Sequence, residues 1–447
     1  MKSNKLNLFD FTMIVVGLVI GMGIFRTAAT SAKYAIDSSV YFSAWIAGGL
    51  IALCGALTYA EIGSRYPVTG GYYKVFAYAY HPSIAFSINC IILISNAASL
   101  AAVALIGSGY ISQVFFDEPA SDVTKALIAT TAVIIFYAVN LMGLRMSAKT
   151  QTVLMIIKIS MILMLISALF LPGAEPVAQT VPVAPVTTSE GIDWMKWIQS
   201  FGLSLIAVSF TYGGYQQTIN FGSEVKEPSK NIPRGIFFGI TIIIILYLLV
   251  NLSYYKVIGF ERLGQEKEIA TIVAGKMFGS AGANAFSALL FLSVLAYVNV
   301  LLMSNPRVMF AMSEDGTLPA VFQKRSQKRD VFVVSLTVFA ALCIIILFFA
   351  QTFEAILNFT IFLDCFGMAA SAASIFWLRK RTKHLDGTGI FSMKLYPLQP
   401  LIFIAAYIFV AISIAVQTPA TALTGIAVLA AFMLLFFLTQ RFRKPKN

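Results

Sequence analysis

Long apolar runs separated by short polar connectors recur along the whole chain. Hydropathy predicts twelve membrane-spanning segments, which we place at 8–33, 40–64, 84–115, 123–142, 150–171, 194–222, 235–258, 284–311, 331–350, 354–378, 398–416 and 421–440. A helix needs about 20 residues to cross the roughly 30 Å of hydrocarbon in a bilayer, and these runs meet that length. The pattern therefore predicts an all-α polytopic membrane protein with 12 transmembrane helices.

Two of these segments are weakened near their midpoints. The first, within "IVVGLVIGMGIFRTAATSAKYAI", carries Gly17, Gly21 and Gly23, and the sixth, within "SFTYGGYQQTINFG", carries Gly213 and Gly214. Glycines in spanning helices can serve only close helix packing. Gly-interrupted spans at corresponding positions of two halves are instead typical of transporters built from inverted repeats. We therefore expect unwound backbone at both places, with free N–H and C=O groups that hold a ligand near the bilayer midplane.

The organisation of the chain supports this interpretation. The connector "PGAEPVAQTVPVAPVTTSEGID" separates a first set of five spans from a second set of five, and two further spans follow. An odd number of spans per set forces the two sets to insert with opposite topology. We predict one transporter domain over 1–447, with repeats at 8–171 and 194–378 and two additional helices within 398–440.

Composition and charge agree with this class. The chain has 447 residues, of which 58% are hydrophobic and 12% charged, too little charge to cover a soluble protein of this size. Of its 32 Lys and Arg residues, 23 lie on the side of the termini and eight on the other, and Lys158 lies within a span. This bias predicts that both termini are cytoplasmic. The net charge of +12 thus reflects membrane orientation, and nucleic-acid binding is not expected.

Enzyme chemistry finds no support in the residues. The N-terminal "MKSNKLNLFDF" leads into the first span without a cleavage site, so we expect no removed signal peptide. We predict neither disulfides, nor a metal site, nor a cofactor, because the few candidate side chains lie inside apolar runs or near span ends: Cys54, Cys90, Cys343, Cys365, His81 and His384. Paired intramembrane acids, a His–Glu metal motif and a Ser–His pair are all missing from the predicted spans.

Four motifs carry a family resemblance. "GLVIGMGIF", "YAEIGSRYPVTGGYYKV" and "NPRVMFAMSEDGTLP" resemble elements of helices 1, 2 and 8 of the amino acid–polyamine–organocation (APC) transporter superfamily. "FTYGGYQQTINFGSEVKEPSKNIPRGI" resembles helix 6 and the following loop of its L-type amino acid transporters (LATs). The motifs occur in the expected order over nearly the whole chain. The resemblance implies a LeuT-type fold of five-plus-five inverted repeats and alternating-access transport of amino acids or related amines.

The resemblance also implies how an amino acid would be held. The backbone N–H groups of Met22, Gly23 and Ile24 would bind the carboxylate. The ammonium would bind backbone carbonyls contributed by both broken helices, namely those of Val19, Ile20, Phe210, Thr211 and Gly213. This chain departs from the family at Met22, where Ser or Thr is more common, so a hydroxyl that could assist the carboxylate is lost.

Lys158, in "TVLMIIKISMIL", lies well inside the fifth span. A lysine at membrane depth is a functional candidate by default, although it could also snorkel to an interface. By resemblance, a lysine of helix 5 occupies the place of the sodium ion in sodium-independent members and contacts helices 1 and 8. Sodium coupling is therefore disfavoured, and exchange or proton symport remain.

Four further residues are candidates for contacts with the substrate. Asp364, in "NFTIFLDCFGMAAS", is the one acid predicted near the middle of a span, and it could recognise a polar or cationic side chain, carry a proton, or be structural. Gln216 and Gln217 follow the helix 6 break, and one of them could instead cap the unwound backbone. Phe210 has the position of the aromatic gate over the substrate, although with 37 phenylalanines a packing role is common.

Charges at span ends suggest an inner gate. Glu61, Arg65, Glu224 and Arg307 flank the expected cytoplasmic ends of helices 2, 6 and 8, where they would pair when the gate closes or simply mark the interface. The loop "FFDEPASD" after helix 3 lacks the cysteine that LATs use to pair with a glycoprotein heavy chain. We therefore expect no disulfide-linked heavy chain and a stand-alone carrier in the bacterial inner (plasma) membrane, surrounded by lipid.

The leading hypothesis is a sodium-independent amino acid transporter. A polyamine or cationic-amine carrier is the alternative within transport, with Asp364 as the counter-charge. A substrate-gated channel or a sensor without turnover is a different class. The sequence offers neither a pore ring nor a repeated filter segment in its favour.

Overall fold

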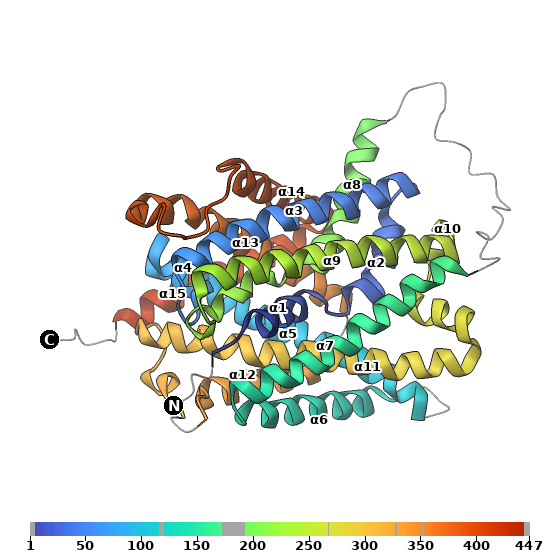
Figure 1. The fold of residues 1–447 in the computed structure, drawn as a ribbon, viewed down its shortest axis with the longest axis horizontal. Coiled ribbons are helices and arrows are strands. Elements are labelled where there is room, and N and C mark those ends of the chain that lie inside the picture. Colours follow the sequence, from blue (N-terminus) through green and yellow to red (C-terminus); the bar gives the residue numbers. More distant parts are fainter. Residues whose placement is uncertain are drawn as a thin grey trace.

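The structure is a computed structural model, and it describes residues 5–115, 120–171, 193–266, 268–326, 329–349 and 353–441. Helices dominate this part of the chain (Figure 1). The first half contains α1 (Leu8–Val19), α2 (Gly23–Tyr34), α3 (Ser38–Arg65), α4 (Gly71–Ala79), α5 (Pro82–Phe115), α6 (Asp122–Leu141) and α7 (Leu144–Ser167). The second half contains α8 (Trp194–Tyr212), α9 (Pro228–Ile258), α10 (Phe260–Leu263), α11 (Ile269–Glu314), α12 (Val333–Phe349), α13 (Phe353–Arg381), α14 (Leu398–Gln417) and α15 (Pro419–Arg441).

Within the described ranges, nine helical segments are long and apolar enough to cross a membrane, and Val333–Phe348 is a shorter apolar helix. The chain is therefore an integral membrane protein. The count of twelve spans stays a prediction, because α8 and α13 do not belong to that set of nine. The predicted connector 172–193, apart from Asp193, and most of the loop after α5 lie outside the described residues.

The two expected helix breaks are present. The first span divides into α1, which ends at Val19, and α2, which begins at Gly23. The sixth ends as an α-helix at Tyr212, ten residues before the predicted end of the span at residue 222. A 3₁₀ helix, η2 (Tyr215–Asn220), then continues the chain. Because neither break continues the α-helical hydrogen-bond ladder, backbone groups are released in the protein interior.

Close packing at the breaks explains why glycine is needed there. A Cβ at position 23 would lie 2.9 Å from the side chain of Thr211. Gly214 has a φ of +110°, a conformation that residues with a side chain rarely adopt. The unwound segments of the two helices thus pass against each other in the middle of the bundle.

The half-helices α2 and α8 are joined by hydroxyl groups along their length. Thr27 and Thr211 share a hydrogen bond next to the breaks. One turn further on, Ser31 Oγ lies 2.6 Å from Ser204 Oγ. Ser200 Oγ then donates to the carbonyl of Tyr34 at 2.8 Å. These contacts make α2 and α8 one unit on the side of the cavity away from η2.

Helices pack around the first span from several sides. In Figure 1, α9 runs beside α3, α1 lies in the middle of the bundle, and α6, α7 and α11 cross the lower part of the view. Buried apolar side chains of these helices form one continuous core. This surrounding bundle holds the unwound backbone of the breaks away from lipid, where bare N–H and C=O groups are not tolerated.

One connector is more ordered than hydropathy suggested. Between the predicted seventh and eighth spans, α10 and the first part of α11 are helical, and Gly279 (φ +72°) marks the kink between two merged helices. The stretch before that kink buries Ile269, Ala270, Val273 and Ala274, a helical spacing. Hydropathy missed this helix because it is too short to span the membrane.

Candidate binding site at the helix breaks

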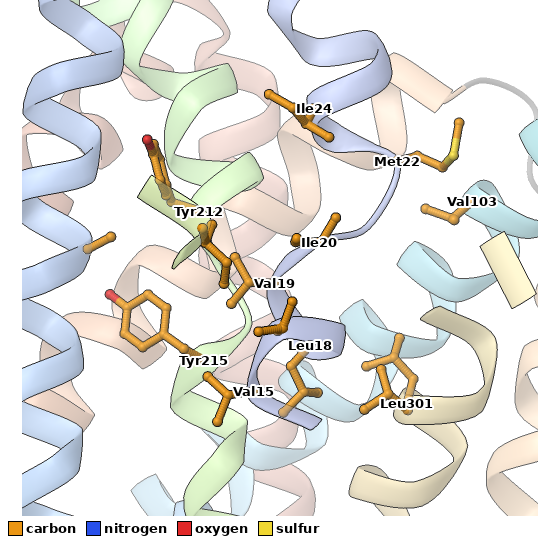
Figure 2. Close-up of a cluster of buried hydrophobic side chains, with 14 of the residues drawn as sticks. Val15, Leu18, Val19, Ile20, Met22, Ile24, Val103, Tyr212, Tyr215 and Leu301 are labelled. Atoms are coloured by element: carbon orange, nitrogen blue, oxygen red, sulfur yellow. The ribbon is translucent and has the colours of Figure 1, made fainter. Parts of the chain in front are cut away.

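A cavity lies where the two breaks meet. Its volume is about 60 Å³, taken as the space open to the centres of water-sized groups. By the same measure one water needs roughly 10–15 Å³. The cavity therefore has room for a small solute. Figure 2 shows the extended segment through Ile20 and Met22 that separates the two halves of the first span. The walls come from α1, α2, α5, α8, η2, α11, α13 and α14, and comprise Leu18, Val19, Gly21, Met22, Gly23, Asn96, Ser99, Val103, Ser209, Phe210, Thr211, Gly213, Gly214, Gln216, Gln217, Tyr297, Asp364, Met368 and Tyr407.

Most of the residues chosen from the sequence lie on these walls. They are Val19, Met22, Gly23, Phe210, Thr211, Gly213, Gln216 and Asp364. Ile20 and Ile24 are fully buried and lie beside the break without reaching the cavity wall. From the sequence, we expected the Ile20 carbonyl and the Ile24 N–H to bind the substrate through backbone. The carbonyl oxygen of Ile20 accepts a hydrogen bond from Lys158.

The start of α2 presents free N–H groups. Met22 is the N-cap residue of α2, and Gly23 and Ile24 occupy its first turn. The first N–H groups of an α-helix have no acceptor within the helix, and the part of the chain that the structure describes supplies none for these three. The positive end of the helix dipole lies at the same place. This end of the cavity is therefore suited to an anionic group.

Carbonyl groups at the ends of α1 and α8 face the same region. The hydroxyl of Tyr247 lies 3.4 Å from the Val19 oxygen and 3.3 Å from the Thr211 oxygen, so that it bridges the two breaks. The oxygen of Phe210 accepts the N–H of Gly213 at 3.2 Å. Each carbonyl oxygen has two lone pairs, so these groups keep acceptor capacity for a cation.

Lys158 reaches the first break from α7. Its side chain is fully buried, and its Nζ donates a 2.5 Å hydrogen bond to the carbonyl oxygen of Ile20. No carboxylate of the described residues forms an ion pair with it. The hydrogen bond joins Lys158 to helix 1, whereas the expected contact with helix 8 is not among the hydrogen bonds of the described residues. The ammonium thus supplies a positive charge at the unwound backbone.

Asp364 contributes a carboxylate to the cavity from α13. It shares the wall with Tyr297 and Tyr407, and the described residues provide it with neither a hydrogen-bond donor nor an ion-pair partner. A carboxylate in a membrane interior is costly unless it meets a donor or a cation. The position of Asp364 therefore leaves it available to a solute in the cavity.

The two glutamines after the second break have different surroundings. Gln216 Oε1 accepts the backbone N–H of Gly214 at 2.9 Å, which caps the broken backbone. Gln217 Nε2 instead donates to Asn96 Oδ1 on α5 at 3.0 Å. One glutamine thus has the capping geometry considered as an alternative, and the other links η2 to α5.

Several wall residues were missed from the sequence. Asn96, Ser99 and Val103 are spaced by three and four residues and lie on one face of α5. Polar residues at that spacing inside an apolar span were a usable signal. Tyr297, whose hydroxyl lies 2.9 Å from Ser99 Oγ, and Tyr407 gave no comparable signal, because the chain has 18 tyrosines.

One buried ion pair joins η3 (Gly222–Glu224) to α11. Arg307 Nη2 lies 2.7 Å from Glu224 Oε2, and both side chains are less than a tenth exposed. The backbone oxygen of Glu224 also accepts the N–H of Leu6 at 2.7 Å, so the pair lies at the end of the bundle where α1 begins. The pair therefore ties η3 to α11 at that end.

Glu61, near the end of α3, is the centre of a second charged cluster. It is fully buried and pairs with Arg65 at 2.7 Å and with Arg379 at 2.6 Å. Arg65 also contacts Asp386, in the segment after α13, at 2.6 Å. The hydrogen bond from Arg65 holds the pKa of Asp386 below its ordinary value. The cluster ties the end of α3 to the segment that follows α13.

Comparisons with known proteins agree with this geometry. A family model described as amino acid permease matches residues 6–439. The serine/threonine exchanger SteT of Bacillus subtilis (strain 168) is 28% identical over 408 residues, covering 90% of this chain and 89% of the relative. The methylthioribose transporter of the same organism is 28% identical over 337 residues, covering 72% of this chain and 70% of the relative. The cystine/glutamate transporter of Homo sapiens is 25% identical over 382 residues, covering 84% of this chain and 74% of the relative. All three are named as carriers, not as enzymes.

Proposed function

The chain belongs to the amino acid permease family of the APC superfamily, and from this premise we propose that it is a sodium-independent secondary transporter of small amino acids. It works by alternating access, with exchange or proton coupling. The observation that carries the proposal is the meeting of two broken helices at a cavity whose wall combines the free N–H groups at the start of α2 with carbonyl groups at the ends of α1 and α8. A zwitterion requires both kinds of group.

The carboxylate of the substrate binds at the start of α2. The N–H groups of Met22, Gly23 and Ile24 and the dipole of the half-helix replace the water that the anion loses. Without such replacement, burying the charge would cost several kcal/mol. Met22 adds an apolar side chain to the same wall, which favours a small substrate in a cavity of about 60 Å³.

The ammonium binds the carbonyl groups at the ends of α1 and α8. Val19, Phe210, Thr211 and Gly213 line the cavity there. Phe210 covers the substrate as an aromatic gate. Ile20 contributes through its carbonyl oxygen, which already accepts the Lys158 hydrogen bond and so lies next to the coupling residue.

Lys158 replaces a sodium ion. Its ammonium contacts the unwound backbone at Ile20 from a fully buried position. When protonated, Lys158 repels sodium and stabilises the same carbonyl group that a metal ion would. Transport is then driven by exchange of one substrate for another, or by a proton that Lys158 or Asp364 carries.

The architecture that we propose is the five-plus-five inverted repeat over 8–171 and 194–378, with two additional helices within 398–440. The breaks in the first helix of each set support this arrangement. The Lys and Arg bias supports cytoplasmic termini in a bacterial inner membrane. The Glu224–Arg307 pair and the Glu61–Arg65–Arg379 cluster then form the closed inner gate.

A second candidate function is a carrier of polyamines or cationic amines. The free carboxylate of Asp364 in the cavity wall favours it. A cationic side chain would pair with Asp364, whereas a small neutral amino acid would leave the carboxylate to its own ammonium or to a proton.

Proteoliposomes decide between these functions. The purified protein is reconstituted, loaded with unlabelled L-alanine, and tested for counterflow of labelled L-alanine in sodium and in choline buffer. We expect equal counterflow in both buffers, inhibited by small neutral amino acids. Inhibition by putrescine and arginine alone would support the cationic-amine carrier, and an absence of trans-stimulation would indicate a channel or a sensor.

A further inference from the structure

Three buried amide side chains form a hydrogen-bonded chain that begins at the cavity. Gln217 of η2 donates from Nε2 to Asn96 Oδ1 at 3.0 Å, and Asn96 of α5 donates from Nδ2 to Asn305 Oδ1 of α11 at 2.7 Å. The three side chains are only 5%, 7% and 1% exposed, respectively. Gln217 and Asn96 line the cavity, and Asn305 lies behind them.

The direction of this chain is fixed at its inner end. Asn305 Nδ2 donates to the backbone oxygen of Leu301 at 2.9 Å, and a carbonyl oxygen can only accept. Asn305 must therefore turn Oδ1 toward Asn96. Asn96 then turns its NH₂ toward Asn305 and its oxygen toward Gln217. Each amide is forced into one of its two flip states by the one behind it.

The consequence concerns the remaining polar atom of Gln217, a residue of the cavity wall. Since Gln217 must point its NH₂ at Asn96, its carbonyl oxygen Oε1 is the group left over. That oxygen is buried and has no hydrogen-bond partner among the described residues. A buried acceptor without a donor is unfavourable, the more so in a membrane interior. It is the kind of group that a ligand satisfies.

From this polarity we infer that Gln217 Oε1 accepts a hydrogen bond from a hydroxyl on the side chain of the substrate. The inference rests on the proposed function. It narrows the proposed substrates from small amino acids in general to those with a side-chain hydroxyl. The ammonium has its own acceptors at the ends of α1 and α8, whereas Gln217 follows the second break and is attached to α5. With the ammonium held there, the Gln217 oxygen is left for a donor on the side chain.

Size supports the same choice. The cavity of about 60 Å³ admits only a few water-sized groups at roughly 10–15 Å³ each. A side chain of one or two heavy atoms beyond Cβ needs less of this room than a long amide or aromatic side chain. Serine and threonine combine the small size with a hydroxyl donor.

The experiment compares two substrates that differ at one group. L-serine and L-2-aminobutyrate have the same shape, with a hydroxyl in one and a methyl in the other. Each competes with labelled L-alanine counterflow in proteoliposomes. We expect the intact protein to prefer serine by about tenfold or more, because 2-aminobutyrate leaves the Gln217 oxygen unpaired. In Gln217→Met the preference should fall to within about twofold, with 2-aminobutyrate inhibition retained.

Asn305 is a positioning residue, and two variants test that role. Asn305→Leu removes the acceptor that orients Asn96 and should reduce the preference for serine. Asn305→Asp, as the neutral acid, keeps an oxygen toward Asn96 and an O–H donor toward the Leu301 oxygen, and should preserve it. The matched control is Asn140→Leu, which disrupts another buried amide pair, Asn140 with Asn299 at 3.0 Å, away from the cavity. Its serine preference should equal that of the intact protein.

The outcomes separate this inference from the proposed function. If alanine counterflow does not occur in the intact protein, the proposed function is wrong. If counterflow occurs and the serine preference is absent, or survives in both Gln217→Met and Asn305→Leu, the inference is wrong. A preference that disappears in Tyr297→Phe and survives in Gln217→Met would assign the hydroxyl contact to Tyr297 instead. If Gln217→Met fails to fold, the Asn305 pair decides.

Discussion

Gly214 lies directly against the carbonyl oxygen of Leu18. A Cβ added at position 214 would be 2.1 Å from that oxygen, far closer than atoms can approach. The backbone of Gly214 also has a φ of +110°, which residues with a Cβ rarely adopt. The two broken helices are therefore in contact through backbone alone at this point.

This contact predicts a severe effect of Gly214→Ala. The new methyl group would clash with the backbone oxygen of Leu18, and no side-chain rotation can relieve that clash. The two breaks must therefore move apart. We expect loss of most counterflow and destabilisation by at least about 2 kcal/mol. Thermal unfolding in detergent and counterflow in liposomes measure both effects.

Gly109→Ala is the matched control, since a Cβ there meets nothing within 4 Å and α5 is helical at that position. It should leave melting temperature and transport at the level of the intact protein. If Gly214→Ala behaves like Gly109→Ala, the close approach of the two breaks is not required for function.

A second prediction concerns Lys158. Replacing it with Met keeps the apolar stem and removes the charge and the hydrogen bond to Ile20. Leaving that buried oxygen without a donor costs about 1–3 kcal/mol. We expect at least about a tenfold loss of counterflow in choline buffer, or a changed pH dependence of uptake. Uptake is measured between acidic and basic pH, in sodium and in choline.

Lys256→Met serves as the control for Lys158→Met. Lys256 also donates from Nζ to a backbone oxygen, that of Leu169 at 2.7 Å, but it lies near the end of α9 and is only partly buried. Its replacement should leave the ion and pH dependence unchanged. Equal uptake by Lys158→Met and the intact protein at every pH would exclude Lys158 from coupling.

A third prediction concerns Asp364, whose carboxylate has no hydrogen-bond or ion-pair partner among the described residues. Asp364→Asn keeps the shape and removes the charge. If the carboxylate recognises a cation, inhibition by arginine and putrescine should weaken by about tenfold while that by alanine is retained. If it carries a proton, the pH dependence of uptake should flatten. Asp122→Asn, at a fully exposed side chain, is the control. If Asp364→Asn matches the intact protein in both inhibition and pH dependence, the role of Asp364 is structural.

Features of the fold that depend on a short stretch of sequence were predictable. Hydropathy placed the apolar helices because each must match the thickness of a bilayer. The breaks at Gly21–Gly23 and Gly213–Gly214 could be located because glycine is the residue that unwound backbone and close approach require. The helix before Gly279 was missed, because the same hydropathy windows do not detect a short amphipathic helix.

The site was predictable on the two broken helices and at Asp364, whose charge stands out within an apolar segment. The residues of the broken helices are adjacent in sequence to a recognisable defect, whereas Asn96, Tyr297 and Tyr407 reach the cavity through tertiary packing. Sequence spacing places side chains on a helix face and does not say which face meets which neighbour. The polarity of the amide chain through Gln217 depends on hydrogen bonds between three elements and could not be derived from the sequence.

The last prediction concerns the buried pair of Glu224 and Arg307. Arg307 also stacks over the ring of Phe221 at 4.4 Å, so its guanidinium is held in place on several sides. Removing one partner of a buried ion pair costs about 3–5 kcal/mol because the other charge remains buried and unpaired. Glu224→Gln should therefore weaken the proposed inner gate and favour states in which η2 and α11 separate.

Hydrogen exchange of residues 215–224 measures this separation. We expect faster exchange in Glu224→Gln than in the intact protein, and a smaller combined effect when Arg307→Gln is added, because the double variant no longer buries an unpaired charge. Glu227→Gln is the control, since its pair with Lys230 is exposed, and such pairs contribute at most about 1 kcal/mol. If the two single variants at 224 and 227 exchange equally, the buried pair does not hold the gate closed. Faster exchange confined to Glu224→Gln, together with reduced counterflow, would show that this ion pair closes the cavity on the side of η2.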